Sequence, residues 1–157
     1  MSTWKVVLLT LLVTLVVVTA TAWALLASEG LNARKKPSNF EYGIANFALA
    51  LSIPSDMKKL ANPVPVTAEN LAEATKHYKE HCAVCHADDG SGQTETAWGM
   101  SPEVPDLHAG HVQRLTDGEL FYVIKNGVRF TGMPAWKLPD DLIWRMVGLM
   151  RKLPEKK

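Results

Sequence analysis

Both cysteines of the chain and two of its five histidines lie in a single short stretch, KEHCAVCHADDG. Cys82 and Cys85 are three positions apart, and His86 follows the second cysteine directly. Two thiols and an imidazole this close together are typical of four kinds of site: a disulfide, a zinc site, a thioredoxin-like dithiol and a site of covalent haem attachment. These four sites differ in the spacing and in the partners that they need.

Three of these interpretations fit the sequence poorly. A disulfide across two intervening residues closes so small a loop that it removes little entropy from the unfolded chain. A structural zinc site needs four ligands, usually from two such pairs, and the sequence has no second cysteine pair. Four other histidines could complete a zinc site only by coincidence: His77, His81, His108 and His111. A redox dithiol is expected between a strand and a helix, whereas this pair follows a helical pattern in a chain without sustained strand patterns.

Covalent haem attachment accounts for all three positions. Two thiols at this spacing reach the two vinyl groups of the macrocycle, and the imidazole of the next residue then lies beneath the iron. The sequence therefore predicts one covalent haem c, with thioether bonds at Cys82 and Cys85 and with His86 as an axial ligand. A zinc site and a bare dithiol remain the alternatives.

The other axial position of the iron needs a second ligand, and the candidates are Met100, Met133, His108 and His111. Met133 is the best placed, because Gly132 and Pro134 hold its backbone in an irregular loop that can direct a thioether at a metal. Met100 lies in the less constrained stretch WGMSPEV. His108 and His111 flank a glycine in a polar loop, so we expect these two histidines at the surface.

Met146 and Met150 belong to a predicted helix, where we expect them to fill gaps in a core.

The N-terminus is a long apolar segment. Residues 6–27 carry no charge over 22 positions, which at about 1.5 Å per residue is enough to cross the roughly 30 Å hydrocarbon core of a bilayer. We predict a retained transmembrane anchor over 6–27, in contact with lipid, after a cytoplasmic tip over 1–5. A cleaved secretory signal is the alternative, with its cleavage site at Ala22-Trp23-Ala24.

Either interpretation places the rest of the chain outside the cytoplasm. The positive-inside rule disagrees, because Arg34, Lys35 and Lys36 follow the segment whereas Lys5 alone precedes it. The haem motif outweighs this count, so we expect the haem domain on the periplasmic side of a bacterial cytoplasmic membrane.

The charge of the chain excludes one class of partner. Of 17 basic residues, one precedes residue 28, so residues 28–157 carry 16 basic and 16 acidic side chains and sum to zero. A balanced chain without a basic stripe does not resemble a nucleic-acid-binding protein.

Helical patterns and caps predict an all-α fold for the part of the chain that carries the motif. A first helix is expected after the N-cap Thr67, and a second after a capping box of Thr116 and Glu119. A third begins near Asp140 and ends by Pro154.

Residues 28–65 are a predicted connector. Apolar residues at positions 40, 44, 47, 48 and 51 recur at helical steps and indicate a short amphipathic helix within it. The prolines of NPVPV break any helix there and mark the start of the domain, 66–157.

Four stretches, CAVCH, TDGELFYVIKNGV, TGMPAW and IWRMVGLMRKLP, together resemble a class I cytochrome c. With the apolar N-terminus, the chain is similar to the membrane-anchored mono-haem cytochromes of bacteria. The resemblance implies an all-helical fold in which the first and last helices cross at a small residue, here Gly148. It also implies that a loop with Pro102 or Pro105 offers a backbone carbonyl to the ligand histidine. Ala87 departs from the family, which often has glycine at this place.

An iron with both axial positions filled by protein has no open site for a substrate, which leaves one-electron exchange. We therefore expect a membrane-tethered electron carrier with His86 and Met133 as axial ligands, and not an enzyme. Its expected partners are a redox protein donor and acceptor, among membrane respiratory complexes, which it serves as a shuttle or as a fixed cytochrome subunit. A haem-based gas sensor is the alternative, and a peroxidase is disfavoured because no distal acid–base histidine is evident.

Apolar and aromatic residues are expected to bury the porphyrin, although the two tryptophans among them fit an ordinary core equally well. They are Leu120, Phe121, Val123, Ile124, Trp98 and Trp136.

Overall fold

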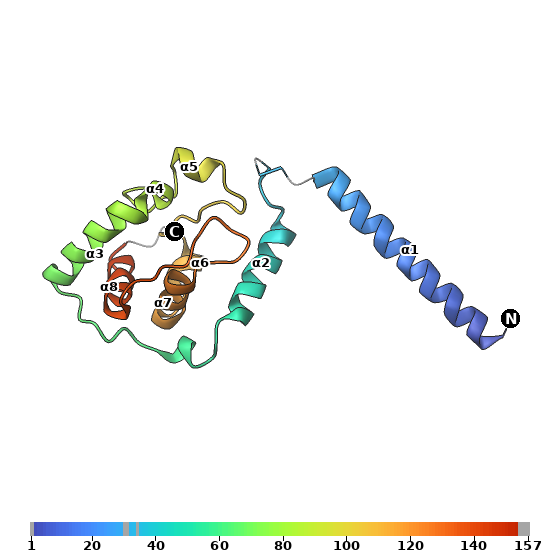
Figure 1. Cartoon of the computed structure of the whole chain (residues 1–157), viewed down its shortest axis with the longest axis horizontal. Helices are drawn as coiled ribbons and strands as arrows, with labels where there is room; N and C mark the ends of the chain where they lie inside the picture. Colours follow the sequence, from blue (N-terminus) through green and yellow to red (C-terminus); the bar gives the residue numbers. More distant parts are fainter. Residues whose placement is uncertain (1, 30–31, 34, 154–157) are drawn as a thin grey trace. The chain divides into compact units, whose positions relative to one another are not determined.

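The computed structural model describes residues 2–29, 32–33 and 35–153 of the chain. Within these ranges every regular element is a helix, which confirms the predicted all-α class. Among the residues outside the described ranges are Met1 of the predicted cytoplasmic tip, Arg34 of the basic cluster, and Pro154 at the predicted end of the last helix. The chain divides into two compact units, Met1–Lys35 and Lys36–Lys157 (Figure 1).

The first unit is the helix α1, Thr3–Glu29. It is long and apolar enough over Thr3–Ser28 to cross a membrane, by length and composition. Its threonine hydroxyls donate to carbonyls one turn back, Thr10 to Val6 at 2.9 Å and Thr21 to Val17 at 2.8 Å. These bonds satisfy the hydroxyls of these two threonines within the helix, as a lipid environment would require.

The second unit begins with the helix α2, Asn39–Ser52, where an amphipathic helix was predicted. Ser38 caps it by accepting from the Glu41 backbone N–H, and the Glu41 carboxylate accepts from the Ser38 backbone N–H. This capping box is readable in the sequence as Ser-x-x-Glu. The apolar side chains of α2 are exposed, among them Phe40 at 74% and Leu51 at 70%.

The rest of the predicted connector packs on the helical domain. A short 3₁₀ turn, η1 (Met57–Lys59), lies against the helix α7, Asp117–Asn126. The contact is close because Gly118 has no side chain, since a Cβ there would stand 1.8 Å from the Met57 carbonyl oxygen. Residues 36–65 therefore belong to the same compact unit as the domain that follows them.

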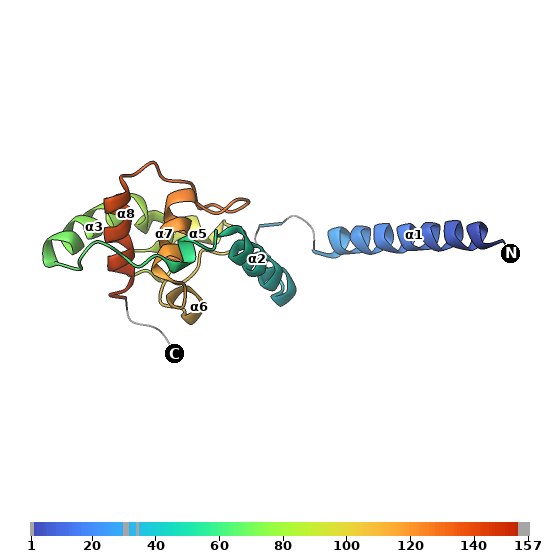
Figure 2. The same ribbon diagram turned by 90° about the horizontal axis from the view of Figure 1, so that it is seen from below.

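Three helices surround the core: α3 (Ala68–His81), α7 and α8 (Asp140–Met150). Helices α3 and α8 cross and pack against each other, as the resemblance implied (Figures 1 and 2). The N-caps predicted for the first two are present, because Thr67 accepts from Asn70 N–H and Thr116 forms a capping box with Glu119. The last helix ends at Met150, a turn before the predicted limit.

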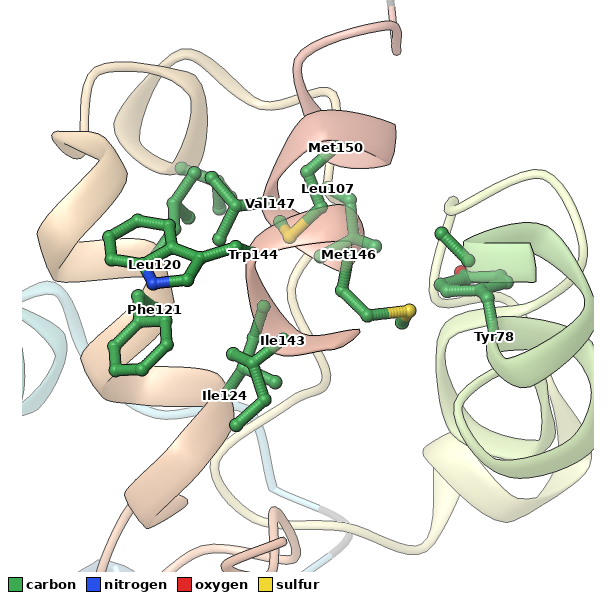
Figure 3. Close-up of a cluster of buried hydrophobic side chains, with 12 residues drawn as sticks. Tyr78, Leu107, Leu120, Phe121, Ile124, Ile143, Trp144, Met146, Val147 and Met150 are labelled. Atoms are coloured by element: carbon green, nitrogen blue, oxygen red, sulfur yellow. The ribbon is translucent and has the colours of Figure 1, made fainter. Parts of the chain in front are cut away.

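The core is built from side chains of these helices, and Figure 3 shows most of them. Phe121 of α7 stacks on Trp144 of α8 with ring centroids 4.2 Å apart. Met146 and Met150 are buried among their neighbours, which confirms the predicted role of these two methionines. The buried members are Ala74, Tyr78, Leu107, Val112, Leu120, Phe121, Ile124, Ile143, Trp144, Met146, Val147 and Met150.

Gly148 is buried, but it does not lie at the contact of the crossing helices. A Cβ at this position would meet Val66 at 3.4 Å and Asn62 at 3.6 Å, both in the segment before α3. Gly148 of α8 thus makes room for the segment before α3. The α3 residue that is fully buried in the core is Ala74.

The long loop between α3 and α7 has local helical structure. It contains the single-turn helices α5 (Glu95–Trp98) and α6 (Gly110–Gln113). The prediction that His108 lies at the surface is wrong, because its side chain is 8% exposed. Its Nε2 donates to the Asp89 carbonyl at 2.6 Å, which satisfies the imidazole and lets it be buried.

Candidate haem site

The cysteine pair lies on one helical turn at the end of α3. Cys82 is both the C-cap of α3 and the N-cap of the short helix α4, Ala83–His86. Its carbonyl accepts from Cys85 N–H at 3.1 Å and from His86 N–H at 2.9 Å, so the turn holds all three residues together. Both cysteines are free thiols and half-buried.

The environment of Cys82 is unfavourable for a thiolate. Burial, followed by the neighbouring Cys85, raises the pKa of Cys82 to about 11. Catalytic dithiols and zinc-binding cysteines act as thiolates, and catalytic dithiols have a lowered pKa. The raised pKa of Cys82 therefore argues against a redox dithiol at this site.

The imidazole of His86 is enclosed at the same turn. Burial lowers the pKa of His86, while the backbone carbonyl of Pro105 acts in the opposite direction. The resemblance implied a carbonyl from a loop with Pro102 or Pro105, and of these two prolines Pro105 is the one whose backbone carbonyl faces the imidazole. Nδ1 of His86 is buried without a hydrogen bond of normal geometry to any residue that the structure describes. A neutral imidazole is the form that binds a metal, so the donor set fits a covalent haem with one histidine ligand.

The backbone around His86 is held from two sides. The Tyr78 hydroxyl donates to the Ala87 carbonyl at 2.7 Å, and Gly92 N–H donates to the His86 carbonyl at 2.9 Å. Ala87 itself adopts φ 62° and ψ 161°. This conformation explains why the family often has glycine there, because a side chain is strained in this region.

Met133 lies in a loop that folds back on the end of α7. Val128 N–H donates to the Met133 carbonyl at 3.1 Å, and Met133 N–H donates to the Thr131 hydroxyl at 3.1 Å. The loop closes on Gly127, which has φ 65° and where a Cβ would stand 2.5 Å from the Pro134 carbonyl carbon. Gly127 is also the C-cap of α7, a role that a glycine after Asn126 indicates in the sequence. Its role in closing the loop depends on the close approach of Pro134, which no local pattern indicates.

The second candidate methionine lies at the same loop. A Cβ on Gly132 would stand 2.6 Å from the sulfur of Met100, so Met100 packs directly against the residue before Met133. Both methionines are half-buried, and Met133 also packs against the core. The structure thus brings together the two sulfur candidates that are 33 positions apart in the sequence.

The two histidine candidates are occupied elsewhere. His108 is bonded to Asp89 as described above, and Nε2 of the exposed His111 lies 2.8 Å from the hydroxyl of Tyr42 on α2. Neither imidazole is brought to Met133 by these contacts.

The residues predicted around the porphyrin divide into two groups. Leu120, Phe121 and Ile124 belong to the core of α7 and α8, and Val123 is half-buried beside them. Trp98 is 71% exposed and is therefore not an ordinary core residue, whereas Trp136 is half-buried.

A family model described as cytochrome c oxidase, cbb3-type, subunit III matches residues 69–150. The match covers more than half of the chain and includes both cysteines, His86 and Met133. No curated protein matches the chain. The family match confirms the cytochrome c resemblance and implies electron transfer by a covalent haem.

Proposed function

Because the chain belongs to the family of cbb3-type cytochrome c oxidase subunit III, we propose that it is a one-electron carrier with one covalent haem c. The observation that carries the proposal is the single turn that presents Cys82, Cys85 and His86 within the family match. Haem, when bound, supplies reversible exchange of one electron at its iron. The chain's own residues hold the group, enclose it and present it to partners.

The proposed attachment uses thioether bonds from Cys82 and Cys85 and a nitrogen of His86 as one axial ligand. The single helical turn that holds the three residues and the buried Nδ1 of His86 support this assignment. Tyr78 and Gly92 keep the turn in place through their bonds to the backbone of residues 86 and 87. The attachment turn is therefore preorganised by the protein.

We propose Met133 as the second axial ligand. Its backbone is fixed at the closed loop after Gly127, so its side chain needs little ordering to act as a ligand. A thioether ligand favours ferrous iron and raises the reduction potential relative to a second histidine. If His86 and Met133 both held the haem, they would leave a substrate no access to the iron, and this would distinguish a carrier from a gas sensor.

The proposed location is the periplasmic face of a bacterial cytoplasmic membrane. Helix α1 would remain as the anchor, since its apolar span exceeds that of an ordinary signal sequence. The family description suggests a membrane respiratory complex as partner, which the carrier would serve as a subunit or as a tethered shuttle between donor and acceptor.

Haem attachment is tested by denaturing electrophoresis of the purified full-length protein. A band that stains for haem near full length is expected, because thioether bonds survive denaturation. The double variant Cys82→Ala/Cys85→Ala should lose the haem stain. The single variant Cys82→Ala should weaken haem attachment, because it removes one of the two thioether bonds. A colourless wild-type band, with haem removed by acid acetone, would refute the proposal.

A further inference from the structure

Helix α3 carries a second group of metal-binding side chains before the haem motif. His77, Glu80 and His81 lie at positions i, i+3 and i+4, which share one face of a helix. One ligand atom from each residue lies within 4.8 Å of the other two. The electron carrier proposed above makes no use of these three side chains.

His77 is the inner member of the group. Its side chain is half-buried, and its Nε2 has no hydrogen-bond partner within the ranges that the structure describes. A buried imidazole nitrogen without a partner is unusual, because desolvation of a polar atom costs free energy that a bond normally offsets. This atom is an independent sign that the group has a ligand.

Trp136 packs against the group from the loop after Met133. Its ring centroid lies 6.5 Å from that of His77 and 5.5 Å from that of His81, and the two imidazole centroids are 4.5 Å apart. The backbone N–H of Trp136 donates to the Lys125 carbonyl at 3.1 Å, which fixes the main chain at this residue. The group therefore has an apolar wall on one side, while Glu80 and His81 are exposed on the other.

Two imidazoles and one carboxylate are a donor set that suits divalent zinc with a fourth position left open. Ligand atoms about 2.0–2.1 Å from a tetrahedral ion stand about 3.4 Å apart. The separation of up to 4.8 Å must therefore shorten by up to about 1.4 Å. Because Glu80 and His81 are exposed side chains on a helix, rotation about their own bonds can close this gap without a change in the backbone.

We propose that His77, Glu80 and His81 form a binding site for one divalent transition-metal ion of the zinc type, separate from the haem site. The site lies on the last turns of α3, and its final ligand directly precedes Cys82. An ion bound there has protein ligands on three sides and an open coordination position toward solvent, which is the arrangement of an exchangeable site.

The experiment is a calorimetric titration of Zn²⁺ into the full-length, haem-loaded protein in detergent, after removal of any affinity tag. Free thiols are first alkylated, so that zinc binding to unreacted Cys82 or Cys85 does not contribute. Alkylation also separates a failure of this proposal from a failure of haem attachment, which the electrophoresis reports. We expect one equivalent of zinc to bind.

The variants His77→Ala and His81→Ala should each weaken zinc binding more than about tenfold, because loss of even an outer-shell partner of a metal site costs about 10–100-fold in affinity. Glu80→Gln should also weaken binding, since it removes the anionic oxygen and keeps the shape. His111→Ala is the matched control, because this exposed histidine lies on α6 outside the group, and it should leave binding unchanged. His81 is exposed, so its variant tests the site without disturbing the core.

Two results would overturn the proposal. One is the absence of stoichiometric zinc binding to the wild type. The other is binding that the His81→Ala variant leaves unchanged, or that His111→Ala reduces as strongly. Far-UV circular dichroism shows whether His77→Ala has a folding defect. If it has one, the variants of the exposed residues, His81→Ala and Glu80→Gln, decide whether the proposed zinc site exists.

Discussion

The backbone conformation of Ala87 predicts that the substitution Ala87→Gly increases the free energy of unfolding. A change to glycine usually decreases it. Ala87 has φ 62° and ψ 161°, a region that glycine adopts freely and that costs other residues about 1–3 kcal/mol. Its neighbours impose this conformation: Ala87 N–H donates to the Ala83 carbonyl at 2.9 Å, and the Ala87 carbonyl accepts from Tyr78 and from Gly90 N–H. The strain therefore persists in the folded state and disappears on unfolding.

The net effect of Ala87→Gly is a difference between two terms. Relief of strain contributes about 1–3 kcal/mol, and the greater freedom of glycine in the unfolded chain subtracts about 0.4–1 kcal/mol. The midpoint is a gain of roughly 1.3 kcal/mol in the free energy of unfolding. With a guanidinium m-value of about 4 kcal/mol/M, the unfolding midpoint should rise by about 0.3 M.

The assay is guanidinium unfolding of the haem-loaded protein, followed by far-UV circular dichroism. Ala72→Gly is the matched control, because Ala72 is exposed in the interior of α3 and the same substitution there should cost about 1 kcal/mol. A variant at position 87 that loses as much stability as the control would show that the backbone at Ala87 is not strained, and the reasoning from its dihedral angles would fail.

Two further predictions concern the proposed ligand and the anchor. Met133→Ala should abolish the weak long-wavelength sulfur-to-iron band of the ferric protein and lower its reduction potential, with haem attachment intact, because the thioethers and His86 do not depend on this loop. Met100→Ala is its control, and loss of the band there but not at Met133 would reverse the ligand assignment. Mass spectrometry of the membrane-extracted protein should find residues 1–27 still present, whereas an N-terminus near Trp23 or at Ser28 would show a processed signal.

Features that depend on local chemistry could be predicted from the sequence. The starts of α3 and α7 follow from the hydroxyls of Thr67 and Thr116, which accept from backbone N–H groups a turn later. The haem motif is local as well, because one helical turn is enough to bring Cys82, Cys85 and His86 together. In each case the partners lie within four residues of one another, so spacing alone determines the contact.

Features that depend on distant partners were missed. The connector docks on the domain because Asn62 donates from its side chain to the Trp144 carbonyl at 2.8 Å and from its backbone to the Asp117 carboxylate at 3.1 Å. Neither partner is indicated by the composition of NPVPV. The prediction that His108 lies at the surface was wrong for the same reason, since its burial depends on a hydrogen bond to the Asp89 carbonyl, 19 positions away in the sequence.

The choice between Met100 and Met133 shows why a ligand assignment needs both kinds of information. From the sequence, Gly132 and Pro134 favour Met133 because they keep its backbone out of a helix. In the structure Gly132 also makes room for the Met100 sulfur, since any Cβ would stand 2.6 Å from it. The same glycine thus shapes the loop of one methionine and packs against the other. Met100 therefore packs against the Met133 loop, and the fixed backbone of this loop supports our proposal that Met133 is the methionine that would bind the iron.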